Sequence, residues 1–188
     1  GVRVPTPYNF HEGVLLMELV ADENGEPAPR LNDVKLSEEV AREYHAILIR
    51  QVVRMLCAGI VHGDLSEYNV LVDSEGPVII DLPQAIDAAA NNNASRMLER
   101  DVDNLATYFG QFAPDLLTTQ YGKEIWALYE TGKLQPETEL TGVFKSDEGQ
   151  ADLNEIMHVI DNARLEDAAR RVRKALQTAA VKPPESDF

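Results

Sequence analysis

Three polar side chains in the stretch HGDLSEYNVLVDSEGPVIIDLPQA have the types and spacing for metal-dependent chemistry. Asp64 lies two residues after His62, Asn69 lies five residues after Asp64, and Asp81 ends an apolar run. If the two β-rich segments between Asn69 and Asp81 form a hairpin, the bases of its strands bring these two side chains together. Carboxylate and amide oxygens are hard ligands that suit Mg²⁺ or Mn²⁺, which leave further coordination positions to water and to phosphate oxygens.

Asp64 is then available for a different task. A carboxylate beside a metal–phosphate group can accept a proton from a hydroxyl or orient a nucleophile. Asp and Asn are also ordinary turn residues, and a single His-x-Asp segment is more often a turn than a site. Here, however, a long helix, a polar loop, a hairpin and a strand that ends in Asp follow one another, and this order favours a site.

The elements that must position these residues are visible in the sequence pattern. Ser37 begins a helix as its N-cap, and Glu38 and Glu39 fill its first turn. Gly59 ends this helix. A short strand at residues 60–62 leads into the polar loop, and the runs VLVD and PVIID are joined by SEG as a hairpin. The apolar positions of the long helix recur at helical spacing: Val40, Tyr44, Ile47, Leu48, Val52, Met55 and Leu56.

The flanking segments complete a mainly helical pattern. The opening GVRVPTPYNF predicts an extended entry, and residues 13–20 predict a buried strand. After a polar break a helix begins near Ser95, and another covers roughly residues 122–131. Residues from about 151 to 181 predict two helices that break near Asn162. A little β structure, one long helix, a hairpin and then only helices indicate an α+β fold with a mainly helical body.

The composition limits the classes of function. The 188 residues include 17 basic and 32 acidic side chains, which give a net charge of −15. This charge disfavours broad, direct binding to nucleic acid, and the locally basic residues 164–176 predict a solvated helix face. We find no membrane-length apolar run and no signal peptide, and we therefore expect a cytoplasmic protein without a membrane partner. The single cysteine, Cys57, is expected to be a small buried apolar residue.

The polar loop and the strand after it resemble those of the RIO family of atypical protein kinases. The matching segments are HGDLSEYNVLV and IIDLPQA, and GVRVPTP and LLMELV are similar to the approach to the hinge in that family. Ordinary protein kinases have Arg and Lys where this chain has Gly63 and Ser66. They have Phe-Gly where it continues Leu82-Pro83-Gln84. The resemblance covers about residues 1–112 and implies a protein-kinase-like fold that binds ATP with Mg²⁺ or Mn²⁺.

The resemblance also implies roles for individual residues. Asp64 corresponds to the catalytic Asp, and Asn69 and Asp81 correspond to the metal ligands. In RIO proteins the metal Asp can itself accept phosphate, which gives an aspartyl-phosphate and an ATPase-like cycle, so Asp81 is also the candidate phospho-acceptor. Ser66 stands where ordinary kinases have a Lys that assists transfer. Because a hydroxyl carries no charge, we expect it to stabilise a phosphate oxygen less strongly.

The same resemblance places an adenine-binding hinge at residues 17–20. Met17 corresponds to the gatekeeper, and the backbone carbonyl of Glu18 and the backbone N–H of Val20 are expected to bind the adenine edge. Asp101 corresponds to an Asp that hydrogen-bonds the backbone of the catalytic loop, and an exposed helical Asp is the alternative. His62 is expected to buttress this loop rather than to act as a base.

A working kinase site also needs groups that cover the phosphates. Neither G-x-G-x-x-G nor V-A-I-K occurs in the 188 residues. We therefore expect residues 1–22 to be the end of an N-lobe with its hinge, residues 23–181 to be a C-lobe, and residues 182–188 to be a tail. We expect this chain alone to have little or no phosphoryl-transfer activity.

Three functions are consistent with these residues. The first is an ATP- and Mg²⁺-dependent serine/threonine kinase or ATPase of the RIO type, whose protein substrate or assembly partner the sequence does not identify. A small-molecule kinase of the aminoglycoside or choline type also uses HGDL, a later Asn and an ID metal site. The third is a non-catalytic, kinase-like scaffold. The SEYN segment and the Pro83-Gln84 pair favour the first.

Overall fold

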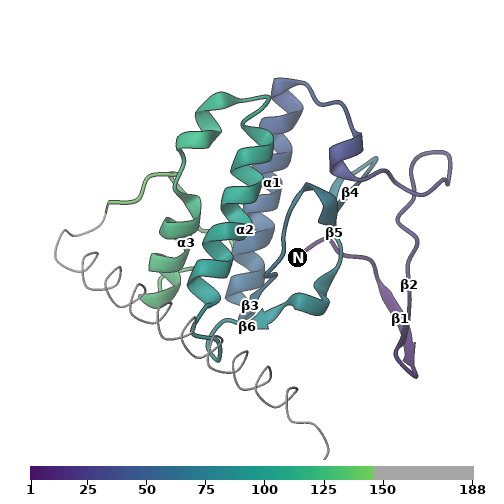
Figure 1. Cartoon of the computed structure of the whole chain (residues 1–188), viewed down its shortest axis with the longest axis horizontal. Helices are drawn as coiled ribbons and strands as arrows, with labels where there is room; N and C mark the ends of the chain where they lie inside the picture. Colours follow the sequence, from purple (N-terminus) through teal and green to yellow (C-terminus); the bar gives the residue numbers. More distant parts are fainter. Residues whose placement is uncertain (146–188) are drawn as a thin grey trace, which may run out of the picture. The chain divides into compact units, whose positions relative to one another are not determined.

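The computed structural model describes residues 1–145 of the 188 (Figure 1). The predicted helices over residues 151–181, the basic stretch 164–176 and the predicted tail lie outside the described residues.

Regular elements in the described part alternate between short strands, single-turn 3-10 helices and three α-helices. In chain order they are β1 (Pro7–His11), β2 (Val14–Met17), η1 (Leu31–Asp33), α1 (Glu38–Cys57), β3 (Ile60–Val61), η2 (Glu67–Asn69), β4 (Val70–Asp73), β5 (Gly76–Ile79), η3 (Leu82–Gln84), β6 (Ile86–Asp87), α2 (Ala94–Phe109), η4 (Pro114–Thr118) and α3 (Tyr121–Glu130).

The three α-helices lie side by side and enclose the main apolar core (Figure 1). Each helix has one apolar stripe that it must bury against a neighbour, and the stripes meet at side chains with no exposed surface. These fully buried side chains include Leu48, Leu56, Leu105, Phe109 and Ile125. The predicted α+β fold is confirmed. In the part of the chain that the structure describes, no helix is long and apolar enough to cross a membrane.

The long helix α1 begins and ends where its sequence signals predict. The hydroxyl of Ser37 accepts a hydrogen bond from the N–H of Val40 at 3.3 Å, which satisfies one of the free donors of the first turn. At the other end Ala58 closes the last turn, and Gly59 follows with φ +78°. This left-handed position is the usual place for glycine after a helix.

The β4–β5 hairpin is held against α1 by a buried amide. Its strands pair antiparallel, with Val70 opposite Ile79, as the SEG turn predicts. On α1, Gln51 is 2% exposed, and its side chain accepts from the N–H of Arg3 at 2.9 Å and donates to the carbonyl of Pro77 at 3.4 Å. Gln51 therefore fixes both the hairpin and the first residues of the chain to the helical body.

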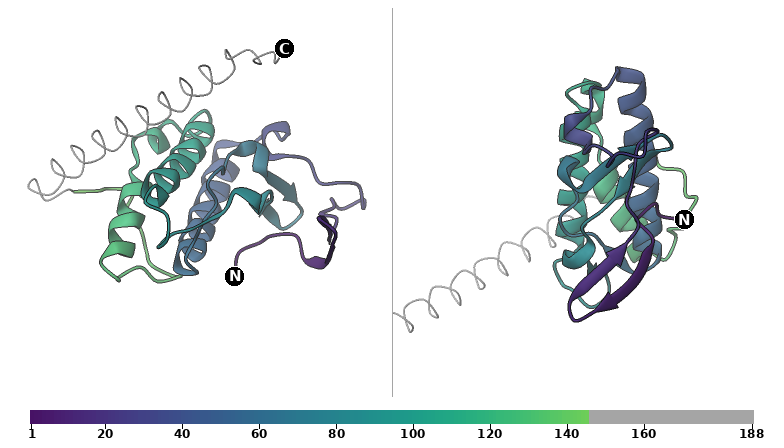
Figure 2. Two further views of the ribbon diagram at one scale, coloured as in Figure 1. Left: turned by 60° about the horizontal axis from the view of Figure 1, so that its bottom comes forward. Right: turned by 90° about the vertical axis from the view of Figure 1, so that its right-hand side faces the viewer.

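The prediction of a buried strand at residues 13–20 is wrong. Only residues 14–17 form a strand, β2, and it pairs with β1 in a hairpin that projects from the body on the side away from α3 (Figures 1 and 2). Both strands are exposed along their whole length, and Val20 alone in this run is buried. Apolar side chains without alternation predicted burial, but nothing among the described residues covers either face of this hairpin.

Two other details differ from the sequence analysis. Cys57 is exposed rather than buried, because it is the last residue of α1 and lies on the solvent side of the stripe. The short strand β3 has a partner that the pattern did not predict: β6, only two residues long, pairs with it antiparallel. A two-residue strand contains too little alternation to be detected in a sequence.

A glycine in the polar loop permits a close approach between two segments. Gly63 has φ +81°, and a Cβ atom placed there would lie 2.9 Å from the backbone oxygen of Gln84 and 2.7 Å from the terminal methyl of Met97. The Met97 methyl can move, but the Gln84 carbonyl belongs to backbone. Glycine is therefore required at this position both for its backbone angle and for space.

We predict that Gly63→Ala lowers the free energy of unfolding more than Gly59→Ala does. Both positions have positive φ, which costs an L-residue about 1–2 kcal/mol. A Cβ at Gly59 meets nothing within 4 Å, so this variant isolates the backbone term. The crowding at Gly63 should add about 1–3 kcal/mol in urea denaturation. Equal losses in the two variants would contradict the close packing of the loop against Gln84.

One histidine in the core has no hydrogen-bond partner on its ring. His45 is 3% exposed, its Nε2 atom has no partner within the described structure, and its ring packs edge-on against Phe109 and obliquely against Tyr121. Burial lowers the pKa of His45 to about 4. The folded protein therefore holds this ring neutral at neutral pH.

We predict that His45 makes the fold acid-labile. Its pKa is lower in the folded state than the ordinary value of about 6.5, so the unfolded chain takes up the proton first as the pH falls. The resulting stability loss begins below about pH 6.5 and reaches about 3 kcal/mol near pH 4. Urea denaturation at pH 7, 5.5 and 4.5 should show a shallower loss in His45→Leu than in wild type. His11→Gln, on exposed β1, is the control and should follow wild type; parallel curves for wild type and His45→Leu would refute the assignment.

Candidate functional site

Asp64 lies in a loop between β3 and η2 where two of its neighbours reach its carboxylate. The amide of Asn69 lies 3.5 Å from the Asp64 Oδ2 atom and donates more closely, at 2.8 Å, to the Asp64 carbonyl. The amide of Gln84 lies 3.4 Å from the same Oδ2 atom. Asp64 is only half-buried, so its other carboxylate oxygen can meet a ligand from solvent.

The backbone around Asp64 is bonded entirely by side chains. Asp101 accepts from the N–H of Gly63 at 2.7 Å and from the N–H of Leu65 at 3.1 Å. The Gly63 carbonyl accepts from Arg100, and the Leu65 carbonyl accepts from Asn104 at 3.0 Å. Together with the bonds of Asp64 itself, every N–H and C=O group of residues 63–65 therefore has a side-chain partner, although this loop belongs to no strand or helix.

Asp101 is buried, in contrast to the exposed helical Asp that the sequence left open. It is 1% exposed on α2. Burial raises the pKa of Asp101 above its ordinary value, and the two backbone N–H bonds act in the opposite direction. Its carboxylate uses both oxygens, one for each flanking residue of Asp64.

His62 bonds on both sides of its ring, which fixes its tautomer. Its Nδ1 accepts from the N–H of Asp64 at 3.3 Å, and its Nε2 lies 3.0 Å from the carbonyl of Ile80. Because Nδ1 must accept, the proton resides on Nε2 and is donated to Ile80. His62 thus ties the Asp64 loop to the residue before Asp81 and has no ring nitrogen left for catalysis.

Asn69 and Asp81 are brought to the same end of the hairpin. The N–H of Ile80 donates to the carbonyl of Asn69 at 3.0 Å, one step beyond the Val70–Ile79 pair, so Asp81 directly follows the last bonded residue. Asp81 has φ +66° and ψ +57°, a left-handed backbone that Asp tolerates better than most residues. Its carboxylate makes no hydrogen bond or ion pair with the rest of residues 1–145. Unusual backbone of this kind is characteristic of functional sites.

The donor chemistry at this end of the hairpin fits a hard divalent ion. The side-chain amide of Asn69 points its nitrogen at Asp64, which leaves the Oδ1 atom of Asn69 for a cation, and Asp81 supplies a free carboxylate. Within residues 1–145, no three His, Cys, Asp or Glu side chains gather closely enough to hold a metal ion by themselves. An ion bound here would therefore need water and phosphate oxygens as well, as Mg²⁺ commonly does.

The contact between Gln84 and the Asp64 carboxylate was not predicted from the sequence. Gln84 lies in η3, directly after the left-handed Asp81, and reaches the Asp64 carboxylate. The Leu82-Pro83-Gln84 segment served only as a family marker in the sequence. No signal in the sequence indicates this contact, because it depends on the left-handed turn at Asp81 that directs Gln84 back to the loop.

The predicted hinge residues follow the exposed β2 strand. Met17 ends β2 and is 49% exposed. Glu18 is tied to Thr6 twice: its N–H donates to the Thr6 carbonyl at 2.9 Å, and its carboxylate accepts from the Thr6 N–H at 3.0 Å. Among the described residues, no backbone hydrogen bond uses the carbonyl of Glu18 or the N–H of Val20. These are the two backbone groups that the family resemblance assigned to adenine.

Ser66 begins η2 and is half-buried beside the loop. Its carbonyl accepts from the N–H of Asn69 at 3.0 Å, and its hydroxyl caps no helix. The hydroxyl thus lies close in sequence and space to the loop without a structural task in the helix that it precedes.

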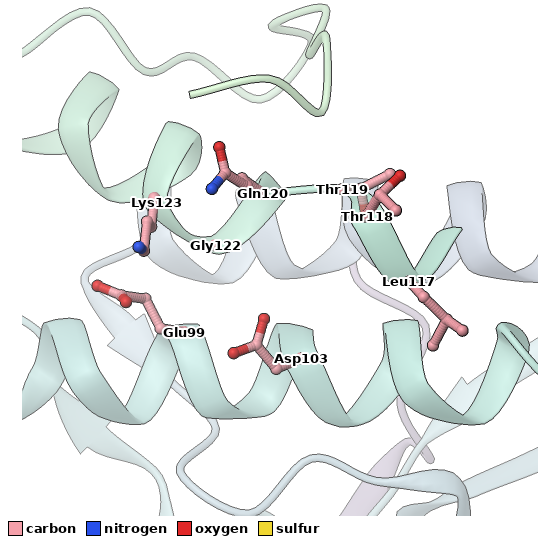
Figure 3. A pocket seen from close by; sticks show the side chains of 8 residues that line it. All are labelled: Glu99, Asp103, Leu117, Thr118, Thr119, Gln120, Gly122 and Lys123. Carbon is pink, nitrogen blue, oxygen red and sulfur yellow. The ribbon is translucent and has the colours of Figure 1, made fainter. Parts of the chain in front are cut away.

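The opposite side of α2 faces a separate hollow. Glu99 and Asp103 line it from α2, and Gln120 and Lys123 line it from the start of α3 (Figure 3). These α2 positions lie about half a turn away from Asp101, because successive residues are 100° apart around a helix. The side of α2 that carries Asp101 is therefore distinct from the side that lines the hollow.

A comparison with protein families finds a match to the RIO domain over residues 1–121. Among curated proteins, the RIO-type serine/threonine-protein kinase Rio1 of Haloferax volcanii is 41% identical over 120 residues, which cover 61% of this chain and 38% of that protein. The Rio1 kinase of Thermoplasma acidophilum is 37% identical over 108 residues, covering 57% of this chain and 54% of the relative. Human serine/threonine-protein kinase RIO1 is 33% identical over 120 residues, or 63% of this chain and 21% of the human protein.

The matched region contains the whole candidate site, from the hinge residues to Asn104. The aligned part spans about half or less of the length of these three relatives. The family match ends at residue 121, where α3 begins. Because the family match covers well over half of the 188 residues, the chain belongs to the RIO family of protein-kinase-like proteins.

Proposed function

We propose that this chain carries the metal-binding and proton-accepting residues of an ATP- and Mg²⁺-dependent serine/threonine kinase or ATPase. The observation that supports this most is that Asn69, which hydrogen-bonds the Asp64 carbonyl, lies at the end of the hairpin where Asp81 follows the last bonded residue. The relatives are named serine/threonine-protein kinases, which supports phosphoryl transfer as the reaction class. The protein substrate or assembly partner stays open, since the relatives are longer than the matched region.

The proposed roles follow from which atoms are free. Asn69 Oδ1 and the Asp81 carboxylate would hold the divalent ion, and a bound ion would supply neutralisation of charge on the phosphates of ATP. The Asp64 carboxylate accepts the proton of the attacking hydroxyl or water. Asp64 suits this role because it lies beside Asn69 and is not itself one of the proposed metal ligands. Ser66 can donate its hydroxyl hydrogen to a phosphate oxygen.

Adenine would bind at the hinge. The free carbonyl of Glu18 and the free N–H of Val20 form an acceptor and a donor two residues apart, and this arrangement matches the polar edge of adenine. Met17 borders this position. In this proposal residues 1–22 supply the hinge, and the body from residue 23 onward supplies the metal and proton-accepting groups; the predicted end of that body at residue 181 lies outside the described residues.

Asp81 is also the proposed phospho-acceptor if the cycle runs through an aspartyl-phosphate. In that step a carboxylate oxygen of Asp81 forms a bond to the γ-phosphorus while the bond to the β,γ-bridging oxygen breaks and ADP leaves. Water then attacks the acyl phosphate and restores the carboxylate with release of phosphate. The absence of any ion pair at Asp81 among the described residues leaves its carboxylate free to act as a nucleophile.

Membership in the RIO family favours a protein kinase or ATPase over a small-molecule phosphotransferase. A non-catalytic scaffold would have no need for the left-handed, unpaired Asp81 or for the bonded loop around Asp64.

We predict different defects for two substitutions. Asp81→Asn keeps the side-chain size and the tolerance for left-handed backbone but removes the charge, so Mn²⁺·ATP binding should weaken at least about tenfold and turnover should be lost. Asp64→Ala should bind Mn²⁺·ATP about as well as wild type, while turnover falls about a hundredfold or more. Binding is measured in the 188-residue chain by electron paramagnetic resonance and calorimetry.

Turnover is measured in the longest natural chain that contains these residues, because the 188 residues have no Gly-rich phosphate-covering motif and are expected to turn over ATP poorly alone. Asp103→Asn, on the far side of α2, is the matched carboxylate control and should behave as wild type. Intact Mg²⁺-dependent turnover in Asp81→Asn would contradict the metal assignment, and intact turnover in Asp64→Ala would contradict the proton acceptor.

A further inference from the structure

The loop that carries Asp64 depends on α2 for more than the expected carboxylate. Asp101 accepts hydrogen bonds from the N–H groups of Gly63 and Leu65, the two residues that flank Asp64. Each of these two residues also has a backbone carbonyl that needs a donor. Arg100 donates to the carbonyl of Gly63, and Asn104 donates to the carbonyl of Leu65 at 3.0 Å. Three side chains within five positions of one helix therefore bond all four backbone groups that flank Asp64.

We propose that Arg100 and Asn104 are positioning residues that fix the direction in which Asp64 presents its carboxylate. The effect on turnover rests on the proposed function, while the effect on the loop itself does not. Rotation of the Gly63–Asp64 or Asp64–Leu65 peptide would carry the Asp64 side chain with it, since each peptide plane is rigid. Arg100 and His62 hold the carbonyl and the N–H of the peptide before Asp64. Asn69 and Asp101 hold the carbonyl and the N–H of the peptide after it, and Asn104 holds the carbonyl of the following peptide. The peptide planes on both sides of Asp64 are therefore not free to rotate.

The geometry assigns the two residues separate halves of the loop. Arg100 holds the peptide before Asp64, and its guanidinium also lies 3.9 Å from the Asp101 carboxylate. Asn104 bonds the carbonyl of Leu65, which belongs to the Leu65–Ser66 peptide one step further along the chain, and Asn104 is half-buried. Helical spacing explains the set: residues 100, 101 and 104 lie on one side of α2, since residues three and four apart are neighbours on a helix.

The chemistry of Asn104 suits this contact specifically. Its amide nitrogen donates to a carbonyl, which an Asp of the same shape cannot do, because a carboxylate has only acceptors at neutral pH. Asn104→Asp would therefore place two acceptors against each other. The neighbouring residue Asp103 offers the reverse substitution, Asp103→Asn, as a control. Asp103 lines the separate hollow (Figure 3).

The first test measures amide hydrogen exchange by nuclear magnetic resonance in the full 188-residue chain. In Asn104→Asp and Asn104→Leu, the amides of Gly63, Asp64 and Leu65 should exchange at least about tenfold faster than in wild type, with α1 core amides changed less than twofold. Asp103→Asn should leave all of them within about twofold. Arg100→Met should speed exchange at Gly63 and Asp64, and Arg100→Lys, which keeps a donor, should restore most of the protection.

The second test measures steady-state kinetics in the longest natural chain. Arg100→Met and Asn104→Leu should lower kcat about tenfold or more and leave the KM for Mg²⁺·ATP within about twofold, because the metal and hinge groups are unchanged. Loop exchange at the wild-type rate in both variants, or a uniform acceleration across the whole fold, would overturn the positioning role. If wild type shows no Asp64-dependent turnover, the proposed function fails, and the exchange data still decide whether Arg100 and Asn104 position the loop.

Discussion

The site depends on side chains that replace secondary structure around Asp64. Residues 63–65 lie in no strand or helix, yet all six of their backbone N–H and C=O groups are bonded, each by a side chain. A buried backbone group left without a partner costs as much as a lost hydrogen bond. The loop therefore holds its shape only while His62, Asn69 and the bonded residues of α2 stay in place.

The same hydrogen bonds connect the Asp64 loop to the hairpin segment that carries Asn69 and Asp81, the proposed metal ligands. His62 joins the Asp64 N–H to the Ile80 carbonyl, and Asn69 joins the Asp64 carbonyl to its own position at the base of the hairpin. Gly63 lets the Gln84 backbone approach closely. As a result, hydrogen bonds connect the segments that carry the proposed proton acceptor Asp64 and the proposed metal ligands Asn69 and Asp81, and such preorganisation favours phosphoryl transfer.

Sequence patterns predicted the elements that have strong local signals. The capping Ser37 and the terminal Gly59 defined α1, and the polar spacing predicted which end of the hairpin carries Asn69 and Asp81. Burial of β2 was predicted wrongly, because an apolar run gives no information about whether another segment covers it. The contacts of Arg100, Asn104 and Gln84 were not predicted, since each depends on a tertiary approach between segments 20 to 39 residues apart.

In the proposed site, one divalent ion binds between Asn69 and Asp81 while Asp64 stays free of it. Crystals grown with Mn²⁺ and a non-hydrolysable ATP analogue would test this by anomalous diffraction, which locates the ion directly. We predict an anomalous peak about 2.1 Å from the Oδ1 atom of Asn69 and from a carboxylate oxygen of Asp81, with phosphate oxygens completing the coordination. An ion bound through Asp64 instead, or one that contacts neither Asn69 nor Asp81, would contradict the account.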